Sequence, residues 1–93
     1  MMDEVIGRSI LVSGRVQGVF YRASTVAEAK KLNLKGWVKN LSNGDVLIEV
    51  FGSPKNIKVL INWCKQGPPL SEVADIKIQE IPLREENEFK VAY

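Results

Sequence analysis

The 93-residue sequence contains no histidine and only one cysteine, Cys64. The absence of histidine excludes a catalytic triad built on histidine, an imidazole base and any histidine-liganded zinc site. A single cysteine cannot form an internal disulfide or a cysteine-rich metal site. Cys64 falls on an apolar helical stripe, so we expect a buried, reduced thiol with a packing role rather than a nucleophile.

Long apolar segments are also absent. No hydrophobic run approaches the roughly 18 residues that a membrane-spanning helix requires. The N-terminal segment MMDEVIGRS carries acids before any base and lacks a long apolar stretch, so it does not resemble a signal peptide. We therefore expect a cytoplasmic protein without a membrane partner, folded as a single domain over residues 1–93.

Charge is distributed unevenly, although the net charge is only +2. Residues 1–40 hold seven bases and three acids, whereas residues 72–88 hold six acids and two bases. Three arginines, Arg8, Arg15 and Arg22, lie in an N-terminal stretch without any acid. A local positive field favours an anionic ligand. On charge alone, however, a solvated basic face would be the better interpretation.

The spacing of apolar and turn residues predicts seven elements in the order β-α-β-β-α-β-β. We expect strands at residues 8–13, 35–41, 45–51, 74–79 and 88–93, and helices at 21–33 and from 54 to the glycine at 67. Asn43-Gly44 lies between two apolar runs and predicts a hairpin. This order is the split βαβ pattern. The predicted fold is therefore a ferredoxin-like α+β sandwich, with one antiparallel sheet and both helices on one face.

The two predicted helices differ in their apolar pattern. In the second helix, Ile57, Leu60, Ile61 and Cys64 recur at the spacing of one buried stripe. The first helix has a broader face of mostly small residues, which suits close packing against a sheet. That face consists of Ala23, Val26, Ala27, Ala29 and Leu32.

The segment that joins the first strand to the first helix is long and contains two glycines. It runs Gly14-Arg15-Val16-Gln17-Gly18-Val19-Phe20-Tyr21-Arg22. Glycine accepts positive φ, which lets backbone N–H groups converge on one point, and a helix start adds further unpaired N–H groups. Arg22 falls in the first helical turn, where its planar guanidinium can bind two phosphate oxygens. These features predict a phosphate-binding loop, although by themselves they fit a mobile connection equally well.

Two longer motifs resemble a known family. Residues 13–22, SGRVQGVFYR, resemble the N-terminal signature of the acylphosphatases, and residues 36–46, GWVKNLSNGDV, resemble their second signature. The Gly67-Pro68-Pro69 segment, the strand after it and residues 89–93 also match the layout of that family. The resemblance therefore extends over nearly the whole chain.

The resemblance implies that the protein hydrolyses acyl phosphates, the mixed anhydrides of a carboxylic and a phosphoric acid. Arg22 matches the family's phosphate-binding arginine, and Asn40 matches the asparagine that orients the attacking water. The phosphate-binding loop would comprise Gly14, Arg15, Val16, Gln17, Gly18, Val19, Phe20 and Tyr21. We expect a small-molecule acyl phosphate as substrate and inorganic phosphate as product and inhibitor. We expect no cofactor, no metal and no nucleic acid.

This chemistry does not require a titrating side chain. The leaving group is a carboxylate, which is stable at neutral pH, so that no strong general acid is needed. Phosphoryl transfer depends mainly on positioning and charge stabilisation. An amide side chain can orient a water because it has both an acceptor and donors. In the absence of a protein base, we expect the water's proton to pass to a phosphate oxygen.

Several of these residues have a second interpretation. Asn40 could cap the hairpin, Arg15 could be solvated or steer phosphate without contacting it, and Gln17 could brace the loop by hydrogen bonds. The sequence also departs from the usual family pattern. Phe20 stands where many members have a small residue, often glycine, and Tyr21 replaces a usual phenylalanine. Phe20 could stiffen or shift the loop, which concerns the rate rather than the type of reaction.

Two other functions fit parts of the pattern. A non-catalytic ferredoxin-like module could bind phosphate or nucleic acid, and such domains stack RNA bases on aromatic residues of the central strands. Residues 45–51 offer one aromatic residue and two acids, which is a poor platform for stacking. The chain also resembles the acylphosphatase-like domains of larger carbamoyl-transfer proteins. We favour a free-standing enzyme.

Overall fold

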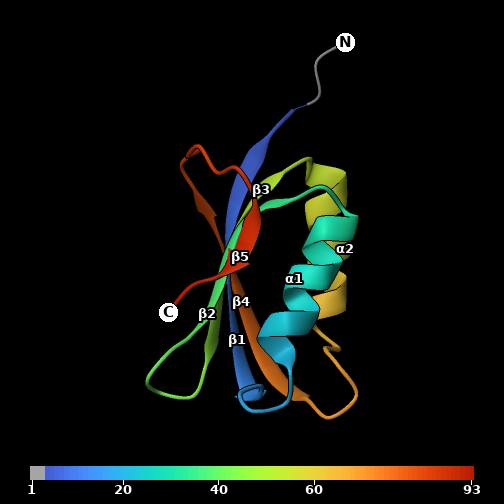
Figure 1. The fold of residues 1–93 in the computed structure, drawn as a ribbon, viewed down its shortest axis with the longest axis vertical. Helices are drawn as coiled ribbons and strands as arrows, with labels where there is room; N and C mark the ends of the chain where they lie inside the picture. The colour runs from blue at the N-terminus through green and yellow to red at the C-terminus, as the bar shows by residue number, and fades with distance from the viewer. Residues whose placement is uncertain (1–3) are drawn as a thin grey trace.

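The computed structural model describes residues 4–93, so the first three residues of the predicted domain lie outside the described part. The seven elements follow the predicted order (Figure 1). They are β1 (Ile6–Arg15), α1 (Tyr21–Lys31), β2 (Lys35–Asn40), β3 (Val46–Gly52), α2 (Pro54–Cys64), β4 (Glu72–Ile81) and β5 (Phe89–Val91). Within residues 4–93, neither helix has the length and apolar character needed to cross a membrane.

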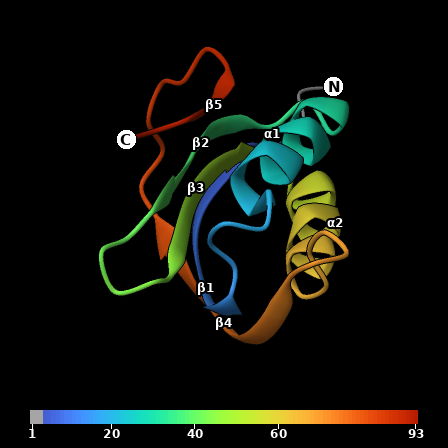
Figure 2. The ribbon, with the colours of Figure 1, turned by 60° about the horizontal axis from the view of Figure 1, so that its bottom comes forward.

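The five strands form one sheet in the order β4-β1-β3-β2-β5. Figures 1 and 2 show both helices packed on the same face of this sheet. The β2–β3 pair is the hairpin predicted from Asn43-Gly44, and its strands are antiparallel from Lys35↔Phe51 to Asn40↔Val46. The predicted ferredoxin-like α+β sandwich is therefore confirmed.

The prediction of a wholly antiparallel sheet was wrong for one strand. β1 pairs antiparallel with β3 and β4, but β5 pairs parallel with β2. β4 and β5 lie at opposite edges of the sheet, so the connection between them crosses the sheet instead of forming a hairpin. The chain reverses direction on the way, so that β5 runs antiparallel to β4 and hence parallel to β2.

The loop between β1 and α1, which the sequence predicts to bind phosphate, begins later than expected because β1 extends to Arg15. Beyond a register shift after Ser13, Gly14 pairs with Val73 and Arg15 pairs with Glu72 of β4. At Gly14, φ is 122° and a Cβ atom would overlap the carbonyl oxygen of Glu72. Glycine is thus required at this position by the close approach of β4.

The core lies between the sheet and the two helices. Three residues of the stripe predicted for α2, Ile57, Leu60 and Cys64, are buried, and the fourth, Ile61, is partly buried against the core. The predicted face of α1 was partly wrong, because its buried residues are Tyr21, Thr25 and Ala29, while Ala23 and Ala27 are exposed. The hydroxyl of the buried Thr25 has a hydrogen-bond partner, because its Oγ1 donates to the Tyr21 carbonyl oxygen at 2.8 Å. Apolar periodicity cannot identify a buried threonine of this kind.

Tyr21 anchors the start of α1 against the end of α2. Its hydroxyl donates a hydrogen bond to the Cys64 carbonyl oxygen at 2.7 Å, and its ring lies 5.5 Å from that of Trp63. Burial raises the pKa of the Cys64 thiol to about 12, so the thiol stays protonated at neutral pH. Cys64 is therefore a core residue, as expected, and Tyr21 fixes the helical turn that carries Arg22.

Candidate active site

A cavity of about 340 Å³ lies between the start of α1, the end of β2 and the last residues of the chain. Its lining consists of Val16, Gly18, Phe20, Tyr21, Arg22, Ala23, Asn40, Val91 and Tyr93. The structure thus brings together Arg22 and Asn40, the two residues that the sequence singled out for catalysis. They come from different elements and meet only because α1 packs over β2.

Arg22 lies in the first turn of α1 and is half-buried. None of the three ion pairs among residues 4–93 involves it. Its guanidinium carbon lies 5.5 Å from the centre of the Tyr93 ring. Since no carboxylate neutralises it in the described part of the chain, its donors are available to an anion.

The backbone of residues 16–20, hereafter the cradle loop, presents unpaired donors. No backbone N–H group of the cradle loop donates a hydrogen bond to an acceptor within residues 4–93. Gly18 and Phe20 both have positive φ, 75° and 66°. Such left-handed residues within a loop turn successive N–H groups toward one point and form an anion-binding concavity. A Cβ at Gly18 would meet nothing within 4 Å, so glycine serves the backbone conformation there.

The start of α1 also lacks a cap. Phe20 occupies the N-cap position and forms no side-chain hydrogen bond, and the first turn contains no acid. At α2, by contrast, Ser53 accepts a hydrogen bond from the Asn56 N–H at 3.2 Å. The N–H groups and the positive dipole end of α1 are therefore left for an external anion.

Asn40 is the last residue of β2 and pairs with the buried Val46. It lies on the helix-facing side of the sheet, as period-two alternation with Val38 predicts. Its side-chain oxygen Oδ1 is buried and has no hydrogen-bond partner among residues 4–93. An unsatisfied buried acceptor costs about 1–3 kcal/mol. The oxygen makes no hydrogen bond to the hairpin, so nothing supports the alternative role as a hairpin cap.

Gln17 braces the loop, which was its second interpretation. Its side-chain nitrogen Nε2 donates to the carbonyl oxygens of Leu41 and Asp45, both at 2.8 Å. Leu41 directly follows Asn40, so these bonds tie the cradle loop to the end of the strand that carries Asn40. The side chain does not line the cavity.

The remaining residues of the predicted loop lie either in β1 or in the core. Gly14 and Arg15 belong to β1 and do not line the cavity, and Arg15 is exposed. Val16 and Val19 bury their side chains in the core and hold the ends of the cradle loop. Of the three arginines in the acid-free stretch, only Arg22 lines the cavity.

Three lining residues were not predicted as site residues: Ala23, which follows Arg22 in α1, and the C-terminal pair Val91 and Tyr93. The C-terminal pair reaches the cavity because β5 lies beside β2, a pairing that no local pattern indicates. Metal ligands do not gather in the described part of the chain: residues 4–93 contain no group of three or more histidine, cysteine, aspartate or glutamate side chains that could bind a metal ion.

Comparison with known proteins gives a consistent result. The profile of the family described as Acylphosphatase matches residues 8–91. An acylphosphatase of Marinobacter nauticus is 48% identical over 77 residues, which cover 83% of this chain and 84% of that protein. The structure of a Coxiella burnetii acylphosphatase is similar with a TM-score of 0.92 and 40% identity, covering 95% of this chain and 93% of that one. Acylphosphatase from Bacillus subtilis also has a TM-score of 0.92, with 36% identity, and covers 97% of this chain and 100% of its own.

Proposed function

Because the chain belongs to the acylphosphatase family and hydrolyses acyl phosphates, we propose that its residues divide this reaction between two sides of one cavity. The cradle loop and Arg22 hold the phosphate, while Asn40 orients the attacking water. The observation that carries this proposal is the buried, unpartnered Oδ1 of Asn40 in the same cavity as the unpaired Arg22.

The phosphate side of the cavity stabilises negative charge. The free N–H groups of residues 16–20 and the uncapped start of α1 supply backbone donors. Arg22 adds a full positive charge and a planar set of donors that matches two phosphate oxygens. Fixed donors of this kind stabilise the charge that spreads over the phosphoryl oxygens in the transition state.

On the water side, Asn40 Oδ1 accepts a hydrogen bond from the attacking water and directs its oxygen toward phosphorus. The new bond from the water oxygen to phosphorus forms as the bond between phosphorus and the acyl oxygen breaks. The acyl group leaves as a carboxylate, and the water's proton passes to a phosphoryl oxygen. The products are therefore a carboxylate and inorganic phosphate, which competes for the same donors and inhibits.

This division of roles needs neither a metal nor a cofactor, so we propose a metal-independent hydrolase. The single reduced cysteine fits a cytoplasmic location. Nothing in the described residues favours the nucleic-acid alternative. Phe51, the only aromatic residue of β3, is buried and has the Arg84 guanidinium 4.9 Å from its ring centre, so that it is not free to stack on a base.

The test is hydrolysis of benzoyl phosphate in the presence of EDTA. We expect turnover by the wild-type protein that survives the chelator and falls by about 10²–10³ or more in Arg22→Ala. Arg15→Ala is the matched control, because it removes the same charge from the same segment outside the cavity, and we expect at most a few-fold change. Near-wild-type turnover by folded Arg22→Ala, or no turnover by folded wild type, would reject the proposal.

A further inference from the structure

Phe20 has an unusual position for an aromatic residue. It is the last residue of the cradle loop and lines the cavity, yet 73% of its surface is exposed. Its φ is 66°, in the left-handed region that disfavours bulky side chains. Core packing does not explain the ring, and the backbone conformation would be less strained with glycine.

A second exposed aromatic ring lies at the same cavity, whose third aromatic residue, Tyr21, is buried. Tyr93 lines it together with Val91, and the Tyr93 ring lies 5.5 Å from the Arg22 guanidinium carbon. The lining of the cavity beyond the cradle loop and Asn40 is therefore largely apolar or aromatic. Apolar side chains beside a few polar groups are typical of sites that bind the non-reacting part of a small molecule.

The charge of the cavity restricts the acyl group further. Arg22 is the only lysine or arginine among its lining residues. When Arg22 binds the phosphate, no other cationic side chain of the lining can pair with a carboxylate on the acyl group. Desolvating such a carboxylate without a partner is unfavourable.

We propose that Phe20 and Tyr93 form an acyl-binding wall that selects uncharged, apolar acyl groups and favours aromatic ones. This inference rests on the proposed function, because the phosphate held at Arg22 is what places the acyl group beside these rings. Phe20 is then a specificity-determining residue, and its exposed ring is covered when the substrate binds.

Three substrates test the wall: acetyl phosphate, benzoyl phosphate and succinyl phosphate. We expect wild-type kcat/KM to be highest for benzoyl phosphate, roughly tenfold above acetyl phosphate, because the phenyl ring buries additional apolar surface. Succinyl phosphate, with its second carboxylate, should have the lowest kcat/KM.

Phe20→Gly and Phe20→Asn remove the ring while accepting positive φ. The readout is the ratio of kcat/KM for benzoyl phosphate to that for acetyl phosphate, because a general effect on the loop cancels in the ratio. We expect the ratio to fall about fivefold or more in both variants. Leu83→Ala is the matched control, since Leu83 is another exposed apolar residue, 62% exposed, on the connection between β4 and β5. Its ratio should equal that of the wild type.

An unchanged ratio in both folded Phe20 variants would overturn the inference and leave the proposed function standing. Hydrolysis of succinyl phosphate as efficient as that of benzoyl phosphate would overturn it as well. A folded wild-type protein that hydrolyses none of the three substrates would instead refute the proposed function, and the inference with it.

Discussion

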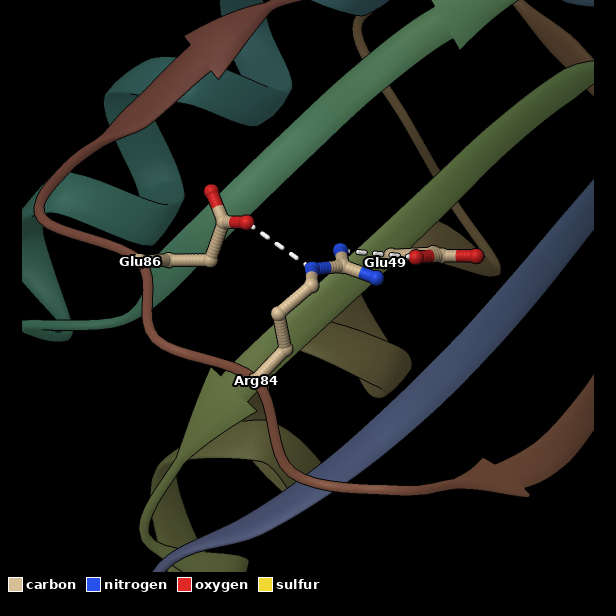
Figure 3. A network of polar contacts seen from close by, with 3 residues as sticks. All are labelled: Glu49, Arg84 and Glu86. Carbon is tan, nitrogen blue, oxygen red and sulfur yellow. Dashed lines mark hydrogen bonds and ion pairs between the residues drawn. The ribbon is translucent and has the colours of Figure 1, made fainter.

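Arg22 and Arg84 each lie against an aromatic ring, but their polar surroundings are opposite. Arg84 pairs through Nη2 with Glu49 at 2.8 Å and through Nε with Glu86 at 2.9 Å, as Figure 3 shows. The hydrogen bond to Glu49, and to a smaller extent the one to Glu86, raises the pKa of Arg84 above its ordinary value. Arg22 has no ion-pair partner among residues 4–93.

The difference is the one expected between a structural arginine, Arg84, and the proposed phosphate-binding arginine, Arg22. Arg84 belongs to the connection that crosses the sheet, and Glu49 lies on the face away from the helices because it alternates with the buried Ile48 and Val50. Its ion pairs attach that connection to the sheet. Arg22 lies among other unsatisfied groups, namely the N–H groups of the cradle loop and Asn40 Oδ1. Unsatisfied polar groups that gather around one cavity indicate a site completed by a ligand.

Apart from Arg22→Ala, the largest expected effect is at Asn40. Asn40→Ala should lower kcat for benzoyl phosphate by about 10²–10³, because the water loses its orienting acceptor. Its thermal midpoint should not fall, since the substitution removes a buried oxygen that has no partner. Asn43→Ala is the matched control, because Asn43 Oδ1 already accepts a hydrogen bond from the Asp45 N–H at 3.0 Å. Equal rates for the two variants would contradict the role of Asn40.

Lysine substitutions at the two arginines separate the effect of the positive charge from that of the planar guanidinium donors. Arg22→Lys keeps the charge but loses the planar pair of donors, so we expect kcat/KM to fall by about 10–10². The same substitution at Arg84 should leave kcat/KM within about twofold. Steady-state kinetics on both folded variants would decide this, and equal activities would mean that Arg22 acts only through its charge.

Gln17 links the two sides of the cavity without lining it, so we propose that it is a positioning residue. Gln17→Ala should lower kcat by roughly tenfold and destabilise the fold by about 1 kcal/mol, because the carbonyl oxygens of Leu41 and Asp45 lose a donor. Both values come from kinetics and denaturant unfolding of the same preparation.

Gln17→Glu distinguishes positioning from simple destabilisation. A charged carboxylate facing two carbonyl oxygens is unfavourable, and only its protonated form can donate. The introduced carboxyl should therefore have a raised pKa, and the ratio of variant to wild-type activity should rise as the pH falls. A ratio that is independent of pH would argue against this role.

The smallest effect is expected for Arg84→Ala. We expect kcat/KM within about twofold of wild type and a loss of about 0.5–1 kcal/mol in the free energy of unfolding, since Arg84 is partly exposed and screened by solvent. Added salt should shrink the stability difference. A large loss of activity would mean that the connection also supports the cavity.

Local chemistry explains what could be predicted from the sequence. Apolar periodicity and the Asn43-Gly44 turn act within a few residues, so they determined the order of elements and the hairpin. Arg22 and Asn40 became candidate catalytic residues through the resemblance of two motifs to the acylphosphatase signatures, which could be found because each motif is a continuous segment. Alternation with Val38 also predicted the face on which Asn40 lies.

The tertiary structure decided the features that depend on distant partners. Gly14 belongs to a strand because β4 approaches it. Only the fold shows that Gln17 reaches the hairpin, that Asn40 Oδ1 lacks a partner and that Tyr93 faces Arg22. Each of these depends on contacts between residues far apart in the chain. The parallel pairing of β5 with β2, which completes the cavity, likewise follows from the path of the connection across the sheet rather than from any local pattern.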